Sequence, residues 1–281
     1  NGAQRWIQIT ESFKFQPSET AKILLILFFA QFIMKHREKL NTFRIIGLCI
    51  VLILIPWYLV FDQPDLSTSI VLIAVFCVVM FAGGLSWKFI ITILAVSIPV
   101  FLIAINFLMQ PEVEILDNYQ KNRVMAFLYP DEYSDKEAYQ QINSVTAIAS
   151  GMLDGKGYNN NEITSVVNGN FVSQPQTDFI FAVIGEEFGF KGSVAVIVLL
   201  MGIALECVSI GRQSSDLAGQ IIASGMGGLI AIQGFINIGV ATFILPNTGL
   251  PLPFVSYGLT SLMSLYLGMG FVLNVKLQSK R

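Results

Sequence analysis

The sequence predicts an all-α fold, that of a polytopic helical membrane protein with about seven membrane helices in this chain. Hydrophobic residues make up 54% of the 281 residues and charged residues only 13%, and the mean hydropathy is +0.65. Apolar runs about as long as a membrane helix recur along the chain, and Lys and Arg gather in alternate connections between them. Continuous apolar runs favour helices over the alternating strands of a membrane β-barrel.

A helix needs about 20 residues to cross a bilayer, and somewhat fewer where neighbouring helices shield its ends. In chain order, the segments that qualify are residues 18–34, 45–61, 66–82, 87–108, 192–210, 218–240 and 259–275. The chain opens at Asn1 without Met or a cleavable signal, so we expect it to begin partway through a longer protein.

The basic connection "KHREKLNTFR" at residues 35–44 sets the predicted orientation. Short loops rich in Lys and Arg stay on the cytoplasmic side of a membrane. With alternating crossings, Lys88, Arg212 and the tail "KLQSKR" fall on that same side. The long acidic segment 109–191 is therefore predicted to lie on the outer side.

This outer segment, between the fourth and fifth predicted helices, is far longer than a connection requires. Within it, "DNYQKNRVMAFLYPDE" and "AYQQINSVTAIASGML" carry apolar residues at helical spacing and predict short amphipathic helices along the outer interface. No internal repeat or low-complexity tract divides the chain. We expect a single membrane domain, 1–281, with a structured extracytoplasmic loop at 109–191.

Two polar clusters precede predicted helices on the outer side. In "FQPSETAK", Glu19 and Lys22 are three residues apart and so are neighbours on a helix. A capped and salt-bridged helix entry, with the proline in its first turn, is one interpretation of this cluster. In "FDQPDLSTS", Asp62 and Asp65 lie in a short polar turn between two helices, and both a plain turn and part of a site fit the pattern.

A third cluster, "TDFIFAVIGEE", is predicted to form a helix beginning near Thr177. Asp178 and Glu186, eight residues apart, would then roughly share one face of that helix. The alternative is that Asp178 merely caps the helix, while Glu186 and Glu187 are wetted at the membrane surface. Ionisable groups near lipid tend to face water-filled interiors, which keeps a functional role open.

The fourth cluster, "NIGVATFILPNTGLPLPFVSYGLTS" at residues 237–261, holds three prolines and several glycines between two predicted helices. Irregular backbone at membrane depth is tolerated where protein or a water-filled cavity shields it. We therefore expect a cavity-lining loop. Since all four clusters project to the outer side, their joint placement predicts one outward cavity.

Several classes of function find no support in the composition. The net charge of −2, without a basic face, gives no reason to expect nucleic-acid binding. Cys49, Cys77 and Cys207 lie in or beside apolar runs without CxxC spacing or His partners, so we expect small buried hydrophobic residues. We expect no organic cofactor.

The motifs resemble the SEDS family of shape, elongation, division and sporulation proteins, which includes RodA, FtsW and SpoVE. "NGAQRWI", "FQPSETAK", "QPDLSTS", "YQKNRV", "GKG", "TDFIFAVIGEEFGFKGS" and "LPNTGLPLPFVSYGLTS" occur in family order over nearly the whole chain, and the first and fourth look closer to RodA-like members. Family members have about ten membrane helices, so the resemblance implies about three before Asn1. The chain departs from the family pattern at Leu259 and Thr260, and at Gln176, where the family has His.

The resemblance implies a peptidoglycan glycosyltransferase that polymerises lipid II into β-1,4 glycan strands, in elongation or division, at the outer face of the bacterial cytoplasmic membrane. Asp178 matches the family's essential aspartate and would be the base for the attacking sugar hydroxyl. Glu186 and Glu187 are secondary acidic candidates. Lys22 and Arg123 would contact the phosphates, and Glu19 would orient Lys22. The further substrate-binding candidates are Gln16, Ser18, Asp65, Thr248, Ser256 and Trp6.

The resemblance also implies partners. The substrates would be lipid II and a lipid-linked glycan strand, and the protein partner a class B penicillin-binding protein, a transpeptidase, with membrane lipids around both. Asp65 and Asp178 could hold a divalent cation, Mg²⁺ or Mn²⁺, together with phosphate oxygens. Two other functions stay open: a flippase or transporter of lipid-linked precursors, because an outward cavity with intramembrane charges is also a transporter signature, and a non-catalytic scaffold for a cell-wall synthase.

Overall fold

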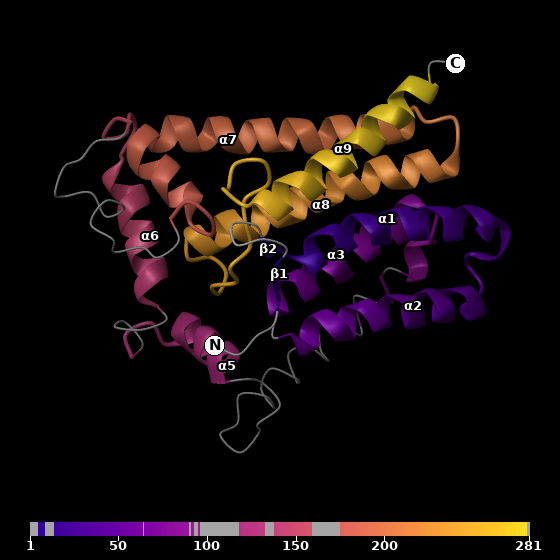
Figure 1. The fold of residues 1–281 in the computed structure, drawn as a ribbon, viewed down its shortest axis with the longest axis horizontal. Coiled ribbons are helices and arrows are strands. Elements are labelled where there is room, and N and C mark those ends of the chain that lie inside the picture. Colours follow the sequence, from indigo (N-terminus) through magenta and orange to yellow (C-terminus); the bar gives the residue numbers. More distant parts are fainter. Residues whose placement is uncertain are drawn as a thin grey trace. The chain divides into compact units, whose positions relative to one another are not determined.

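The computed structural model describes residues 5–8, 14–63, 65–89, 91, 92, 95, 118–132, 138–158 and 175–279 (Figure 1). These residues are mostly helical, which confirms the predicted all-α class. Among them, five helices are long and apolar enough to cross a membrane, and a sixth apolar helix is shorter. The chain is therefore a multi-pass membrane protein. The fourth predicted span, 87–108, lies largely outside the described residues.

The predicted helices agree with the structure to within a few residues, except that α7 begins well before its predicted span. The apolar helices are α1 (Pro17–Lys35), α2 (Phe43–Asp62), α3 (Leu66–Ala82), α7 (Ile180–Arg212), α8 (Leu217–Ala241) and α9 (Leu259–Ser279). The remaining elements are the antiparallel strands β1 (Ile7–Gln8) and β2 (Lys14–Phe15), the short 3-10 helix η1 (Arg37–Lys39), and the helices α5 (Asn118–Leu128) and α6 (Tyr139–Ser150).

The chain forms two compact units. The first consists of Asn1–Lys121, Cys207–Gly228 and Leu267–Arg281, and the second of Asn122–Glu206 and Leu229–Tyr266. The helices α7, α8 and α9 each contribute residues to both units, so neither unit is one continuous segment of chain. The single-domain description of residues 1–281 stays a prediction.

In the first unit, α1, α2 and α3 lie side by side (Figure 1). Ile26 and Ile33 on α1 and Val79 on α3 are almost fully buried, as expected for apolar residues at helical spacing on facing sides. Gly225 of α8 packs against the same core. A Cβ at that glycine would lie 2.9 Å from Ile26 Cγ2 and 3.1 Å from Val79 Cγ2. The absence of a side chain there permits the close approach of the helices.

In the second unit, α6 is tied to the end of α8 by side chains that donate to main-chain carbonyls. Gln141 Nε2 donates to the carbonyls of Val240, at 2.9 Å, and Leu245, at 2.8 Å. Ser144 Oγ donates to the Ala241 carbonyl at 2.7 Å. The two amphipathic helices predicted in the outer segment are thus present as α5 and α6, and α6 holds the point at which α8 ends.

The helix α7 bends at Gly189, whose φ of 64° and ψ of −159° are not helical. The turn after α6 packs against this bend, where the Phe190 N–H donates to the Met152 carbonyl at 2.8 Å. A Cβ at Gly189 would lie 2.5 Å from the Gly155 nitrogen, so only glycine fits. The helix predicted near Thr177 and the span predicted at 192–210 are therefore two arms of one bent element.

Candidate active site

Asp178 lies in the turn of residues 175–179, directly before α7. The helix predicted to begin near Thr177 begins at Ile180, so the predicted sharing of one helical face by Asp178 and Glu186 is wrong. The Asp178 side chain is half-buried, and its main-chain carbonyl accepts a hydrogen bond of 2.8 Å from Asn237 Nδ2 on α8. The carboxylate is thus carried by a turn whose backbone is fixed from another helix.

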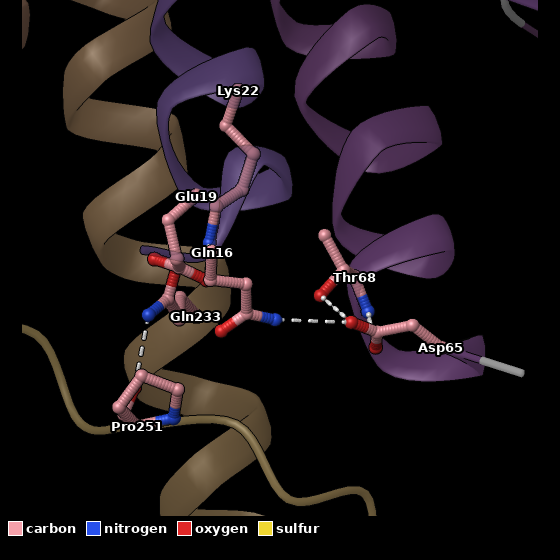
Figure 2. A network of polar contacts seen from close by, with 7 residues as sticks. All are labelled: Gln16, Glu19, Lys22, Asp65, Thr68, Gln233 and Pro251. Atoms are coloured by element: carbon pink, nitrogen blue, oxygen red, sulfur yellow. Dashed lines mark hydrogen bonds and ion pairs between the residues drawn. The ribbon is translucent and has the colours of Figure 1, made fainter. Parts of the chain in front are cut away.

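The loop of residues 242–258, the α8–α9 loop, is irregular as predicted, and buried side chains hold it in place. Asn237 Nδ2 donates to the Leu250 carbonyl at 2.6 Å, and Gln233 Nε2 donates to the Pro251 carbonyl at 2.9 Å, as Figure 2 shows for the second contact. Phe243 and Phe254 have positive φ angles, 60° and 62°. The side-chain donors replace the hydrogen bonds that a regular helix would supply at this depth.

Ser256 joins this loop to the turn that carries Asp178. Its Oγ donates to the Thr177 carbonyl at 2.6 Å and accepts from the Leu252 N–H at 2.7 Å, and the residue is 2% exposed. Next to it, the Tyr257 N–H donates to the Gln176 carbonyl at 2.9 Å. Ser256 therefore has a structural part in the site, and its contact with substrate stays a prediction.

Gly249 brings the backbone of the α8–α9 loop against the Asp178 carboxylate. A Cβ at Gly249 would lie 3.3 Å from Asp178 Oδ2 and 3.9 Å from Arg123 Nη1. Arg123, on α5, also donates from Nη1 to the Asn247 carbonyl at 3.3 Å. The structure thus places the predicted residues Asp178 and Arg123 both near Gly249, and Thr248 directly precedes this glycine in the loop. A carboxylate and a guanidinium thus lie near the same glycine of an irregular loop.

A second polar cluster lies in the first unit, at the N-terminal ends of α1 and α3 (Figure 2). Lys22 Nζ lies 2.8 Å from Glu19 Oε1, which confirms the predicted pairing. The two residues are only 1% and 3% exposed. Because both charges are removed from water, each depends on its partner far more than a surface pair does.

Asp65 connects the entries of α1 and α3. As the N-cap of α3, its Oδ1 accepts from the Thr68 N–H at 3.1 Å, and its Oδ2 accepts from Thr68 Oγ1 at 2.9 Å. Gln16 Nε2 donates to the same Oδ2 at 3.4 Å (Figure 2). Ser18, close to Gln16 and Glu19 in the sequence, is buried. Trp6, directly before β1, is 53% exposed. The substrate-binding roles of all these residues stay predictions.

Comparison with known proteins identifies the family to which this chain belongs. The family model for FtsW, RodA and SpoVE, described as a cell cycle protein, matches residues 1–281. The chain belongs to this family. The match confirms the resemblance to the SEDS proteins, and since it covers the whole chain, both polar clusters lie within it.

Curated relatives and solved structures agree with the family. The chain is 36% identical to the peptidoglycan glycosyltransferase MrdB of Escherichia coli K12 over 280 residues, which are 99% of this chain and 72% of that protein. It is 32% identical to stage V sporulation protein E of Bacillus subtilis 168 over 283 residues, covering 100% and 73%. The fold matches a chain from a study of polymerization and crosslinking by a peptidoglycan synthase complex with a TM-score of 0.79 at 26% identity, covering 100% of this chain and 75% of the other. The rod shape determining protein RodA of Thermus thermophilus gives a TM-score of 0.65 at 26% identity, covering 100% and 71%.

In this SEDS protein, Glu186 is neither wetted nor placed on a helical face with Asp178. It is 2% exposed, and its Oε1 lies 2.7 Å from Lys156 Nζ in the turn after α6. The Lys156 N–H donates to the Glu186 carbonyl at 2.9 Å, and the Gly157 N–H donates to the Glu187 carbonyl at 3.0 Å. The contacts of the two glutamates fasten the first arm of α7 to that turn, and their role as secondary acids stays a prediction.

Sequence reasoning missed several polar residues that frame the site, above all Asn237, Gln233 and Gln141. Each is almost fully buried and donates to a main-chain carbonyl of the α8–α9 loop or of the turn before α7. A signal was present, because amide side chains within an apolar span need partners. The spacing along one helix does not say which distant carbonyls those partners are.

The described residues do not form a complete metal site. No group of three or more His, Cys, Asp or Glu side chains comes together among them. Both oxygens of Asp65 already accept hydrogen bonds, from Thr68 and Gln16. Each carboxylate oxygen has more than one lone pair, so these bonds do not decide the matter, and a divalent cation at Asp65 or Asp178 stays a prediction.

Proposed function

We propose that this SEDS protein is a peptidoglycan glycosyltransferase that polymerises lipid II into β-1,4 glycan strands, with Asp178 as the catalytic base. The curated relative MrdB is named a peptidoglycan glycosyltransferase, and a structural neighbour comes from a peptidoglycan synthase complex. The observation that carries the proposal is that the Asp178 carboxylate and the Arg123 guanidinium both lie within 4 Å of the Cβ position of Gly249.

The reaction needs one proton acceptor and one group that stabilises negative charge. The 4-hydroxyl oxygen of a GlcNAc residue attacks the anomeric carbon of a strand linked to lipid pyrophosphate. The new C–O bond forms as the bond from that carbon to the phosphate oxygen breaks, with inversion at the carbon. Asp178 takes the hydroxyl proton, and the pyrophosphate leaves with the bonding electrons.

Arg123 is suited to the leaving group. A guanidinium can bind two phosphate oxygens at once and keeps its charge at every physiological pH. Its Nη1 donates to the Asn247 carbonyl at 3.3 Å and lies 3.9 Å from the Cβ position of Gly249, near the proposed base. Lys22 is the second candidate cation, with Glu19 fixing its ammonium group.

A divalent cation, Mg²⁺ or Mn²⁺, is also part of the proposal, without a defined set of protein ligands. A hard cation would neutralise pyrophosphate oxygens and lower the barrier for their departure. Asp178 and Asp65 are possible ligands by their chemistry, and Asp65 would keep its hydrogen bonds from Thr68 while binding a cation. The proton transfer and the binding of the leaving group described above are assigned to the protein's own side chains.

The proposal includes a place and a partner. We infer a site on the outer side of the bacterial cytoplasmic membrane, because the basic connection at residues 35–44 and the tail predict the opposite side as cytoplasmic. We also infer a transpeptidase of the class B penicillin-binding type as the partner. The structural neighbour from a synthase complex that both polymerises and crosslinks supports this inference.

The test is strand synthesis from lipid II in detergent, with the full-length protein and its transpeptidase. Wild-type protein is expected to form polymer, and Asp178→Ala to lose at least about 100-fold of the rate, the usual contribution of a general base. Polymer made without a bilayer separates a transferase from a flippase, and also from a scaffold. Robust synthesis by the Asp178→Ala protein would remove Asp178 as the base.

A further inference from the structure

Asn237 lies on α8, one helical turn after Gln233, and binds two backbone segments that are separated in the sequence. It is 1% exposed, and its Nδ2 donates two short hydrogen bonds, to the Asp178 carbonyl at 2.8 Å and to the Leu250 carbonyl at 2.6 Å. The first acceptor belongs to the turn before α7 and the second to the α8–α9 loop. One amide group thus joins the two backbone segments that meet at the carboxylate.

The orientation of this amide follows from its partners. Both are carbonyl oxygens, which cannot donate, so the NH₂ group must face them. The Asn237 Oδ1 atom is buried and has no hydrogen-bond partner among the residues that the structure describes. A buried acceptor without a donor lowers stability, so burial alone would favour an apolar side chain here. What the asparagine supplies is its pair of donors.

These two bonds act at the point where the site needs precision. Leu250 is the neighbour of Gly249, and the Cβ position of Gly249 lies 3.3 Å from Asp178 Oδ2. If the Asp178 carbonyl and the Leu250 carbonyl move apart, the carboxylate and the loop move apart with them. Gln233, one turn earlier on α8, also holds the loop, by donating to the Pro251 carbonyl at 2.9 Å.

We propose that Asn237 is a positioning residue for Asp178: its NH₂ group holds the turn and the α8–α9 loop in register, so that the carboxylate faces the sugar hydroxyl from a fixed place. This inference rests on the proposed role of Asp178 as base. Asn237 itself touches neither substrate nor reacting atoms. It acts on the rate of the chemical step and leaves the binding of lipid II to other groups.

The test uses N237L, which has the same branching, a larger side chain and no donors, and N237D, which has the same shape but places oxygen against two carbonyls. For both, we expect kcat to fall about 10- to 100-fold, the usual effect of a misplaced catalytic group. KM for lipid II should stay within about 2-fold of wild type, because ground-state binding is not changed. A role in packing alone would lower the melting temperature of both variants and leave their kcat unchanged.

The matched control is S144A. Ser144 is fully buried and donates to the Ala241 carbonyl at 2.7 Å, so its removal also deletes a bond to the end of α8, but one that does not reach Asp178. S144A is expected to lower the melting temperature and to keep kcat. Melting in detergent is measured for every variant beside the kinetics.

Each outcome of these experiments either supports or overturns the proposed role of Asn237. Wild-type kcat in a folded N237L or N237D protein overturns the proposal, and so does a rise in KM with kcat unchanged. Failure of both variants to fold while S144A folds also overturns it, because Asn237 would then serve stability. D178N is assayed in parallel: if D178N retains synthesis, the proposed base is wrong, whereas inactive D178N with wild-type N237L removes only the role of Asn237.

Discussion

The two polar clusters of this protein use their side chains in different ways. In the first unit, side chains bind side chains: Lys22 pairs with Glu19, and Gln16 with Asp65. In the second unit, Asn237 and Ser256 donate to main-chain carbonyls around Asp178. The first arrangement pairs the buried charges of Lys22 and Glu19 and gives the Asp65 carboxylate a hydrogen-bond donor. The second builds a backbone frame that presents one carboxylate, so the two clusters should respond differently to mutation.

The largest effect on stability is expected from breaking the buried pair. Glu19→Gln leaves the Lys22 charge buried without its carboxylate, which should lower the free energy of unfolding by about 3 kcal/mol. Thermal melting in detergent measures the loss. The control is Asp154→Asn, because Asp154 and Lys191 form a pair whose side chains are 75% and 71% exposed. That change should cost no more than about 0.5 kcal/mol. Equal melting of both variants would contradict the contrast drawn between buried and exposed pairs.

A smaller loss of stability and a larger loss of activity are expected at Gly249. Gly249→Ala imposes a side chain at φ 73° and places its Cβ 3.3 Å from Asp178 Oδ2. The strain should cost about 1–2 kcal/mol, and displacement of the carboxylate should lower kcat about 10-fold. Kinetics of strand synthesis and melting are measured on the same preparation.

Gly258→Ala is the control for this change. Gly258 lies in the same loop, and the nearest atom to its Cβ position is Ser261 Cβ at 3.6 Å, an ordinary contact. We expect wild-type kcat and almost unchanged melting. Similar losses in the two variants would mean that the loop as a whole, and not its approach to Asp178, governs the rate.

The smallest effect is expected at the cap of α3. Thr68→Val removes the hydroxyl that donates to Asp65 Oδ2 at 2.9 Å and keeps the N–H that donates to Oδ1. One lost hydrogen bond should cost about 1 kcal/mol. The melting temperature should fall slightly, with kcat unchanged. A fall in kcat without a fall in melting temperature would show that the Thr68 hydroxyl takes part in the reaction.

The helices were predictable because their apolar runs are long and their connections polar. The entry of α1 at Pro17 and the pairing of Glu19 with Lys22 followed from local spacing. The bend in α7 did not, because it depends on the contact of Gly189 with the turn after α6. A hydropathy pattern does not report close contacts between backbone segments that are far apart in the sequence.

The site itself was predictable only in part. Resemblance to the SEDS family pointed to Asp178 and Arg123, and the structure brings both to Gly249. Asn237 and Lys156 lie inside motifs noted in the sequence but were given no role, although each fixes a segment of the second unit through a partner far away in the chain. A single sequence shows that a buried amide needs an acceptor, but not which carbonyl meets it.

The central claim is that Asp178 removes the proton of the attacking sugar hydroxyl. It is tested most directly by the single-turnover rate of glycan formation at saturating lipid II, with D178N against wild type. This change keeps the shape of the side chain and removes its ability to accept a proton as a carboxylate. We predict a rate at least about 100-fold lower, with lipid II binding and melting unchanged. A D178N protein that forms glycan at the wild-type rate would contradict the account.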